Sequence, residues 1–114
     1  MSDTQNSLIN TIAVGTSIKG DIQANGDFRM DGILEGNITM NGKFVLGESG
    51  HIVGNVVCQN ANVLGIIDGD VSVKEMLTLY EHSKIKGNIV ANKLAIEPGA
   101  RFTGTCHMLD ELAE

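Results

Sequence analysis

Three histidines and two cysteines are the residues of this chain with the most versatile chemistry. His51, His82 and His107 could hold a zinc ion or act as general bases, and Cys58 and Cys106 could act as nucleophiles or form a disulfide. The cysteines lack the close paired spacing of zinc and redox motifs, so each is expected to be a reduced thiol. The chain shows no Ser/His/Asp or Cys/His set. We therefore predict no catalytic site, no metal site and no enzyme activity.

Gly-Asp and Gly-Asn pairs recur along the chain and could serve as phosphate-binding loops or calcium sites. Glycine lets the backbone approach an anion, and aspartate supplies hard oxygen ligands. However, no Lys-Ser/Thr follows any of these glycines, and no acidic nonapeptide pattern is present. Gly followed by Asn or Asp is also what a tight corner between strands requires. We interpret these pairs as corners and expect no cofactor.

The corners belong to a repeat, which indicates the elements that position every other residue. The pattern is apolar, any residue, Gly, Asp or Asn, apolar, any residue, apolar, and its sixth copy carries Thr105 after the glycine. The intervals between successive glycines are 16, 18, 15, 18 and 17 residues, so one period recurs with small insertions. The six glycines are Gly20, Gly36, Gly54, Gly69, Gly87 and Gly104.

A second apolar pair precedes each copy of the pattern. Alternating apolar positions of this kind indicate short, half-buried strands. A period near 17 with the same apolar slots predicts that each strand pairs with its copy one coil later, in parallel ladders about 4.8 Å apart. The pairs are Ile12/Val14, Phe28/Met30, Phe44/Leu46, Val63/Leu64, Leu77/Leu79 and Leu94/Ile96.

The predicted fold is all-β: a single right-handed parallel β-helix, or β-solenoid, of about six coils with a triangular section. Six coils would rise about 29 Å. The domain is expected to span residues 12–108, between a short flexible tail of residues 1–11 and a short acidic tail of residues 109–114. Cys58 and Cys106 occupy inward slots and are expected to be small buried hydrophobes, with the histidines on the surface. One inward core column should contain Ile22, Ile38, Val56, Val71, Ile89 and Cys106.

The composition narrows the function further. A formal charge of −6 and a pI near 4.9 leave no basic field for nucleic acid. No apolar run approaches the roughly 20 residues of a membrane span, and residues 1–10 lack the features of a signal peptide. We expect a cytoplasmic protein that binds no nucleic acid.

The two ends of the predicted solenoid are the candidate functional surfaces. Each end exposes unpaired strand edges and a cross-section of apolar core, which identical subunits can cover by stacking on one another. The alternative is that the terminal tails fold over the ends and cap them. The predicted polymer interface consists of Ile12, Val14 and Ile18 at the N-terminal end and Phe102, Cys106 and Met108 at the C-terminal end.

The order of the corner motifs resembles the bactofilins, a family of bacterial cytoskeletal proteins. The matching stretches are Ile33-Leu-Glu-Gly36, Gly47-Glu-Ser-Gly50 before Ile52-Val-Gly54, and Pro98-Gly-Ala-Arg-Phe-Thr-Gly104. The resemblance implies a right-handed β-helix that polymerises without nucleotide into non-polar filaments, through head-to-head and tail-to-tail contacts. It also implies that Phe102 supports the contact at the C-terminal end.

The resemblance further implies a scaffold for cell-shape, envelope-building and peptidoglycan-modifying proteins at the inner face of the cell membrane. Many relatives bind membrane through an apolar or basic leader. Here residues 1–10 are polar except for Leu8 and Ile9 behind the first methionine, which argues against direct membrane binding.

Two other classes of protein repeat short apolar-Gly units. Trimeric left-handed β-helix acyltransferases contain hexapeptides such as Leu46-Gly-Glu-Ser-Gly-His51, but they keep about 18 residues per coil, and coils of 15 and 16 residues break that lattice. Ice-binding solenoids repeat Thr-x-Thr, which occurs here only at Thr103-Gly-Thr105. A soluble trimer would favour the enzyme, and long polymers would favour the scaffold.

Overall fold

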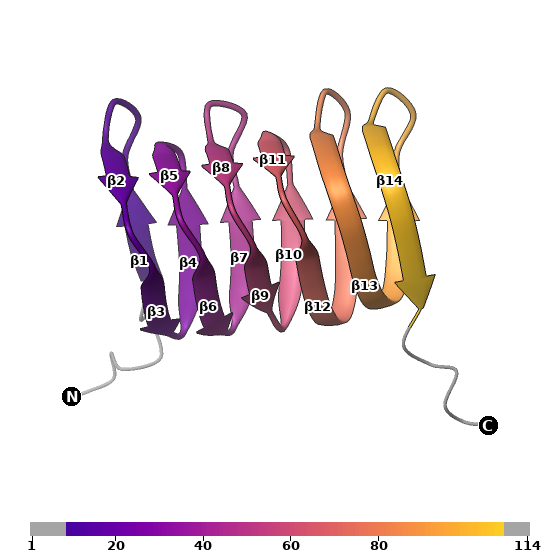
Figure 1. The fold of residues 1–114 in the computed structure, drawn as a ribbon, viewed down its shortest axis with the longest axis horizontal. Coiled ribbons are helices and arrows are strands. Elements are labelled where there is room, and N and C mark those ends of the chain that lie inside the picture. Colours follow the sequence, from indigo (N-terminus) through magenta and orange to yellow (C-terminus); the bar gives the residue numbers. More distant parts are fainter. Residues whose placement is uncertain (1–8, 109–114) are drawn as a thin grey trace.

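The structure, a computed structural model, describes residues 9–108 and contains fourteen β-strands in one continuous sheet. All strand pairs are parallel, and each strand pairs with its equivalent one coil earlier or later (Figure 1). This arrangement confirms the predicted all-β parallel solenoid of about six coils. The right-handed winding and the triangular section remain predictions.

Each coil contributes one strand segment to each of three ladders. The first ladder contains the strands that precede the variable corners, and in the last two coils it is formed by the C-terminal parts of two longer strands. Its members are β1 (Ile9–Ile12), β4 (Asp27–Met30), β7 (Lys43–Leu46), β10 (Asn60–Val63), β12 (Val71–Leu79) and β13 (Lys84–Ile96).

The second ladder lies between the variable corners and the Gly-Asp/Asn corners. It contains β2 (Ser17–Lys19), β5 (Ile33–Glu35), β8 (His51–Val53), β11 (Ile66–Asp68) and the N-terminal parts of β13 and β14 (Arg101–Met108). The third ladder follows the Gly-Asp/Asn corners. It contains β3 (Ile22–Asn25), β6 (Ile38–Asn41), β9 (Val56–Cys58), the start of β12, the middle of β13 and the end of β14.

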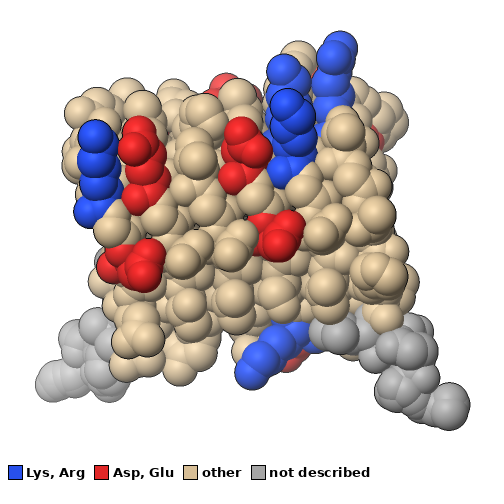
Figure 2. All heavy atoms as spheres, viewed as in Figure 1, with Lys and Arg blue, Asp and Glu red and all other residues tan. Residues whose placement is uncertain are grey.

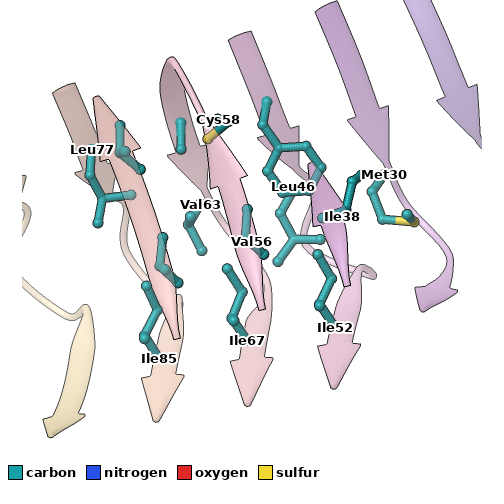
Figure 3. Close-up of a cluster of buried hydrophobic side chains, with 14 of the residues drawn as sticks. Met30, Ile38, Leu46, Ile52, Val56, Cys58, Val63, Ile67, Leu77 and Ile85 are labelled. Atoms are coloured by element: carbon teal, nitrogen blue, oxygen red, sulfur yellow. The ribbon is translucent and has the colours of Figure 1, made fainter. Parts of the chain in front are cut away.

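Apolar side chains from the three ladders meet inside the solenoid and form one core (Figure 3). The predicted column lies in the third ladder in the expected register, from Ile22 through Val71 to Cys106. Ile38, Val56, Val71 and Ile89 are buried, whereas Ile22 is only half-buried because it lies in the first coil.

Two of the apolar pairs read from the sequence are wrong. Val63 shares the interior with Ala61, and Leu64 lies beyond the end of β10. In the first coil Ile12 pairs with Met30, and Val14 falls in the turn after β1. The predicted domain start is also late, because residues 9–11 belong to β1 and pair with β4, so the predicted tail of residues 1–11 overlaps the sheet. The predicted C-terminal tail lies outside the described residues.

The glycine of each repeat stacks directly on the glycine of the coil before it. Gly69 has a φ of +154°, and a Cβ built on it would overlap the carbonyl oxygen of Gly54. The same overlap occurs at the equivalent glycines of the second to sixth coils, whereas a Cβ on Gly20, in the first coil, would meet nothing within 4 Å. The repeating glycine is therefore required by the close approach of successive coils as well as by its backbone conformation.

The Asp or Asn that follows each glycine links one coil to the next. Asn55 Oδ1 accepts a hydrogen bond from the backbone N–H of Asp70 at 3.1 Å, and the N–H of Asn55 donates to Asn37 Oδ1 at 3.0 Å. The same bond joins Asn37 to Asp21 and Asn88 to Asp70. These polar residues therefore satisfy corner N–H groups, which gives a structural reason for their repetition.

Candidate interface surfaces at the solenoid ends

The last coil presents its inward side chains at one end of the solenoid. Strand β14 pairs with β13 alone, so no further coil within residues 9–108 covers it. Phe102 is half-buried, Cys106 is exposed and Met108 is 42% exposed. Leu94 and Ile96 end the first ladder beside them, and Ile96 is 50% exposed. We call these five residues the C-terminal end surface.

The sequence prediction named three of these five residues. It missed Leu94 and Ile96, although their position as the last apolar pair could have identified them. The expectation that Cys106 is buried is wrong. Cys106 lies in the inward column, in register with the buried Ile89, but no seventh coil covers it within the described residues.

The first coil presents the opposite end. Its inward positions hold Asn10, Ile12, Ile18, Ile22 and Ala24, which we call the N-terminal end surface. The four apolar residues are half-buried, whereas the residues stacked on them in the second coil are buried. Within residues 9–108, strands β1, β2 and β3 each have one partner strand, so their outer edges leave backbone groups without a partner in this part of the chain.

The turn after β1 changes the composition of this end. The sequence predicted Val14 as an interface residue, but Val14 is 69% exposed in the turn and lies off the inward columns. Asn10 instead occupies the second inward position of β1, in register with Phe28. Its Nδ2 donates to the backbone oxygens of Asn25 at 3.2 Å and Asp27 at 3.4 Å. The N-terminal end is therefore partly polar where the C-terminal end carries Leu94.

The two cysteines differ sharply in reactivity. Cys58 ends β9 inside the core, where burial disfavours the thiolate and raises the pKa of the thiol to about 12. Both thiols are free, and Cys106 is exposed. Because the thiolate is the nucleophile, Cys58 is unreactive in the folded protein and Cys106 is its accessible thiol.

The three histidines lie on different parts of the solenoid. His51 is half-buried on β8, His82 is exposed in the turn between β12 and β13 with a φ of 73°, and His107 is exposed on β14. No cluster of three or more His, Cys, Asp or Glu side chains capable of holding a metal ion occurs in residues 9–108. The three histidines are therefore not brought together into one site.

A parallel β-solenoid with apolar end surfaces belongs to the class of repeat proteins. Two solved structures share the fold over nearly their whole length. The chain aligns with a Thermus thermophilus bactofilin, solved by cryo-EM as double helical filaments, with a TM-score of 0.81 and 24% identity over 85% of this chain and 96% of that one. It aligns with the cytoskeletal bactofilin BacA, solved by solid-state NMR, with a TM-score of 0.80 and 27% identity over 90% of this chain and 98% of that one.

A family model named bactofilin, described as polymer-forming cytoskeletal, matches residues 10–107. The chain therefore belongs to the bactofilin family, which is a structural family of cytoskeletal polymers and not a family of enzymes. The enzyme alternative raised by the hexapeptide at residues 46–51 does not fit this assignment.

No curated protein sequence matches the chain significantly. Within residues 9–108, no helix is long and apolar enough to cross a membrane.

Proposed function

We propose that this chain polymerises end to end, without nucleotide, into non-polar filaments that serve as a cytoplasmic scaffold. The observation that carries the proposal is the exposure of inward core residues at both ends, above all Phe102 and Met108 at the C-terminal end. Stacking a second subunit on either end removes this apolar surface from water. The free energy gained by this burial favours assembly without the binding or hydrolysis of a nucleotide.

The different ends favour contacts between like ends. In a head-to-tail stack that continued the solenoid, Asn10 of one subunit would lie over Leu94 of the next, because both belong to the same inward column. A tail-to-tail contact instead places the apolar C-terminal end surface against its own copy. A buried aromatic side chain such as Phe102 often supplies much of the binding free energy of a protein–protein contact.

The proposal extends to the cellular role through the family. The filaments would hold cell-envelope or peptidoglycan-modifying proteins at the inner face of the cell membrane. The solved T. thermophilus relative forms double helical filaments, and we propose that filaments of this chain likewise associate in pairs. The residues of this chain support only one of these contacts directly, which is the contact with further copies of the chain.

Electron microscopy of Phe102→Arg tests the end contact. Tail-to-tail assembly would bring the introduced charges together, so this variant should remain a small folded species, whereas the wild type forms filaments in buffer with EDTA and without nucleotide. His107→Arg is the matched control, because His107 is exposed on the same strand between two inward residues. Wild-type polymers in Phe102→Arg, or filaments that require ATP, GTP or a divalent ion, would contradict the proposal.

A further inference from the structure

The outward side of the second ladder is a flat face that differs from the rest of the surface. We call it the second-ladder face. Because side chains alternate along each strand, two columns point outward. One column contains Ser17, Ile33, His51, Ile66, Lys84 and Arg101, and the other contains Lys19, Glu35, Val53, Asp68, Lys86 and Thr103.

Three large apolar side chains are exposed on consecutive coils of this face. Ile33 is 40% exposed, Val53 44% and Ile66 39%. The remaining large apolar residues that are exposed lie at the ends, in turns or singly on other faces. These three side chains lie around His51, with Glu35 and Asp68 on either side of Val53. Exposed apolar residues grouped among charges in this way are typical of a surface that contacts another protein.

The charges on the face are separated along the solenoid. Basic side chains gather at the β13–β14 end, acidic side chains lie on the coils before it, and a single lysine, Lys19, lies on the first coil (Figure 2). A hollow of about 370 Å³ on this face is lined by Ile66, Lys84, Lys86 and Arg101 among others. The ion pairs of the described residues are Arg29–Asp31 and a contact between His82 and Glu81, so none involves the charges of this face.

We propose that the second-ladder face packs against the same face of a second copy that runs antiparallel to it. In the antiparallel register in which the fifth coil of one copy faces the third coil of the other, Lys84 and Lys86 lie between Glu35 and Asp68, one coil of about 4.8 Å from each. In a parallel arrangement each coil of one copy would face the same coil of the other copy, which would place Lys84, Lys86 and Arg101 against their own counterparts. The net charge of −6 opposes self-association, so a contact that pairs the basic cluster with acids is the favourable one.

The size of the face determines when this contact forms. Six coils of about 4.8 Å and strands of three residues at about 3.3 Å each give a face of roughly 300 Å². A stable interface buries about 800 Å² per partner. One pair of subunits is therefore held weakly, but the contact repeats along a filament and gains from multivalency. The face thus pairs filaments, and this inference rests on the proposed end-to-end assembly.

Reversing the charges on either side of the contact tests the pairing. One variant, called basic after the residues it replaces, carries Lys84→Glu and Lys86→Glu. The variant called acidic in the same sense carries Glu35→Lys and Asp68→Lys, and a third protein combines all four substitutions. The control, Lys74→Glu with Lys93→Glu, changes the net charge as the basic variant does, but at two exposed residues away from this face. Circular dichroism establishes that each variant is folded, and filament width in electron micrographs at low ionic strength is the measurement.

Wild-type and control filaments should lie in pairs, and added salt should separate the wild-type pairs. The basic and acidic variants should form filaments with at least roughly tenfold fewer pairs, and the combined variant should recover them. Wild-type filaments that stay single at low salt would overturn this inference and the proposed pairing, and would leave the end-to-end assembly standing. Variants that pair like the wild type would overturn this inference alone. A wild type that forms no filaments would refute the proposed function and this inference with it.

Discussion

Phe102 lies in register with Ile85 across β13 and β14, and it is the last residue of the inward column of the second ladder. Ile85 is 2% exposed, because it has a neighbour in the column on both sides. Phe102 is half-buried, with a neighbour on one side only among the described residues. Ile85 is therefore expected to contribute mainly to folding of the subunit, and Phe102 mainly to assembly of subunits.

Alanine substitutions at this pair should affect different processes: subunit stability at Ile85 and polymerisation at Phe102. Ile85→Ala removes a fully packed side chain and should lower the free energy of unfolding by about 2–5 kcal/mol. Phe102→Ala should cost less in subunit stability but abolish sedimenting polymers. Urea unfolding and pelleting of both variants provide the comparison. A Phe102→Ala protein that is as unstable as Ile85→Ala and still polymerises would identify Phe102 as a core residue.

The stacked glycines predict a second effect. Gly69→Ala forces a Cβ against the Gly54 carbonyl and should destabilise the subunit by about 3 kcal/mol or more. Gly20→Ala is the matched control, since its φ of +128° carries a backbone penalty but its Cβ meets no atom within 4 Å. Thermal melts in the Phe102→Arg background measure the difference without polymer. Equal melting temperatures for the two alanine variants would show that coil stacking imposes no steric limit.

The hydrogen bonds between corners predict a third, smaller effect. Asn55→Ala removes the acceptor of the Asp70 N–H and should lower subunit stability by about 1 kcal/mol. Asn62→Ala should change it little, because Asn62 is absent from the side-chain hydrogen bonds of residues 9–108. Chemical denaturation in the same background compares them. If Asn55→Ala unfolds at the same urea concentration as its parent, water replaces the lost acceptor without cost.

Burial of Cys58 predicts a dependence of stability on alkaline pH. The pKa of its thiol is raised to about 12 by burial, so the unfolded state loses its proton first as the pH rises. The contribution of the buried thiol is therefore complete below about pH 9 and is lost between about pH 9 and 12, by up to roughly 4 kcal/mol. Urea unfolding at pH 7 and 10.5 should show a larger loss for the wild type than for Cys58→Val. Parallel losses would mean that Cys58 ionises as easily in the folded protein as in the unfolded one.

The repeat made most of the fold predictable from the sequence. Because every coil must stack on the one before it, the glycine corner and the apolar slots recur, and the period alone determined which residues pair. The errors occur where one coil departs from the others. Asn10 takes an inward position in the first coil, and Ala61 takes one in the fourth coil, where the pattern predicts the more apolar Leu64.

The surfaces were less predictable than the fold. The exposure of Cys106 depends on which coil is last, and an apolar residue has the same local pattern in the middle of the solenoid as at its end. The second-ladder face carries no repeat at all, since its outward column passes from Ile33 through His51 to Arg101. Outward side chains are free of the packing constraint that keeps inward ones periodic.

The central claim is that like ends meet in the filament, and Cys106 offers a direct test. Cys106 lies on the C-terminal end surface, Cys58 is buried, and the chain contains no other cysteine. A short bismaleimide added in substoichiometric amount to assembling subunits should therefore join two Cys106 residues across the tail-to-tail contact. We expect a covalent dimer and no larger covalent species in the wild type, and no crosslink in Cys106→Ser. Wild-type filaments that form no such dimer, although a monofunctional maleimide labels Cys106 in free subunits, would contradict tail-to-tail assembly.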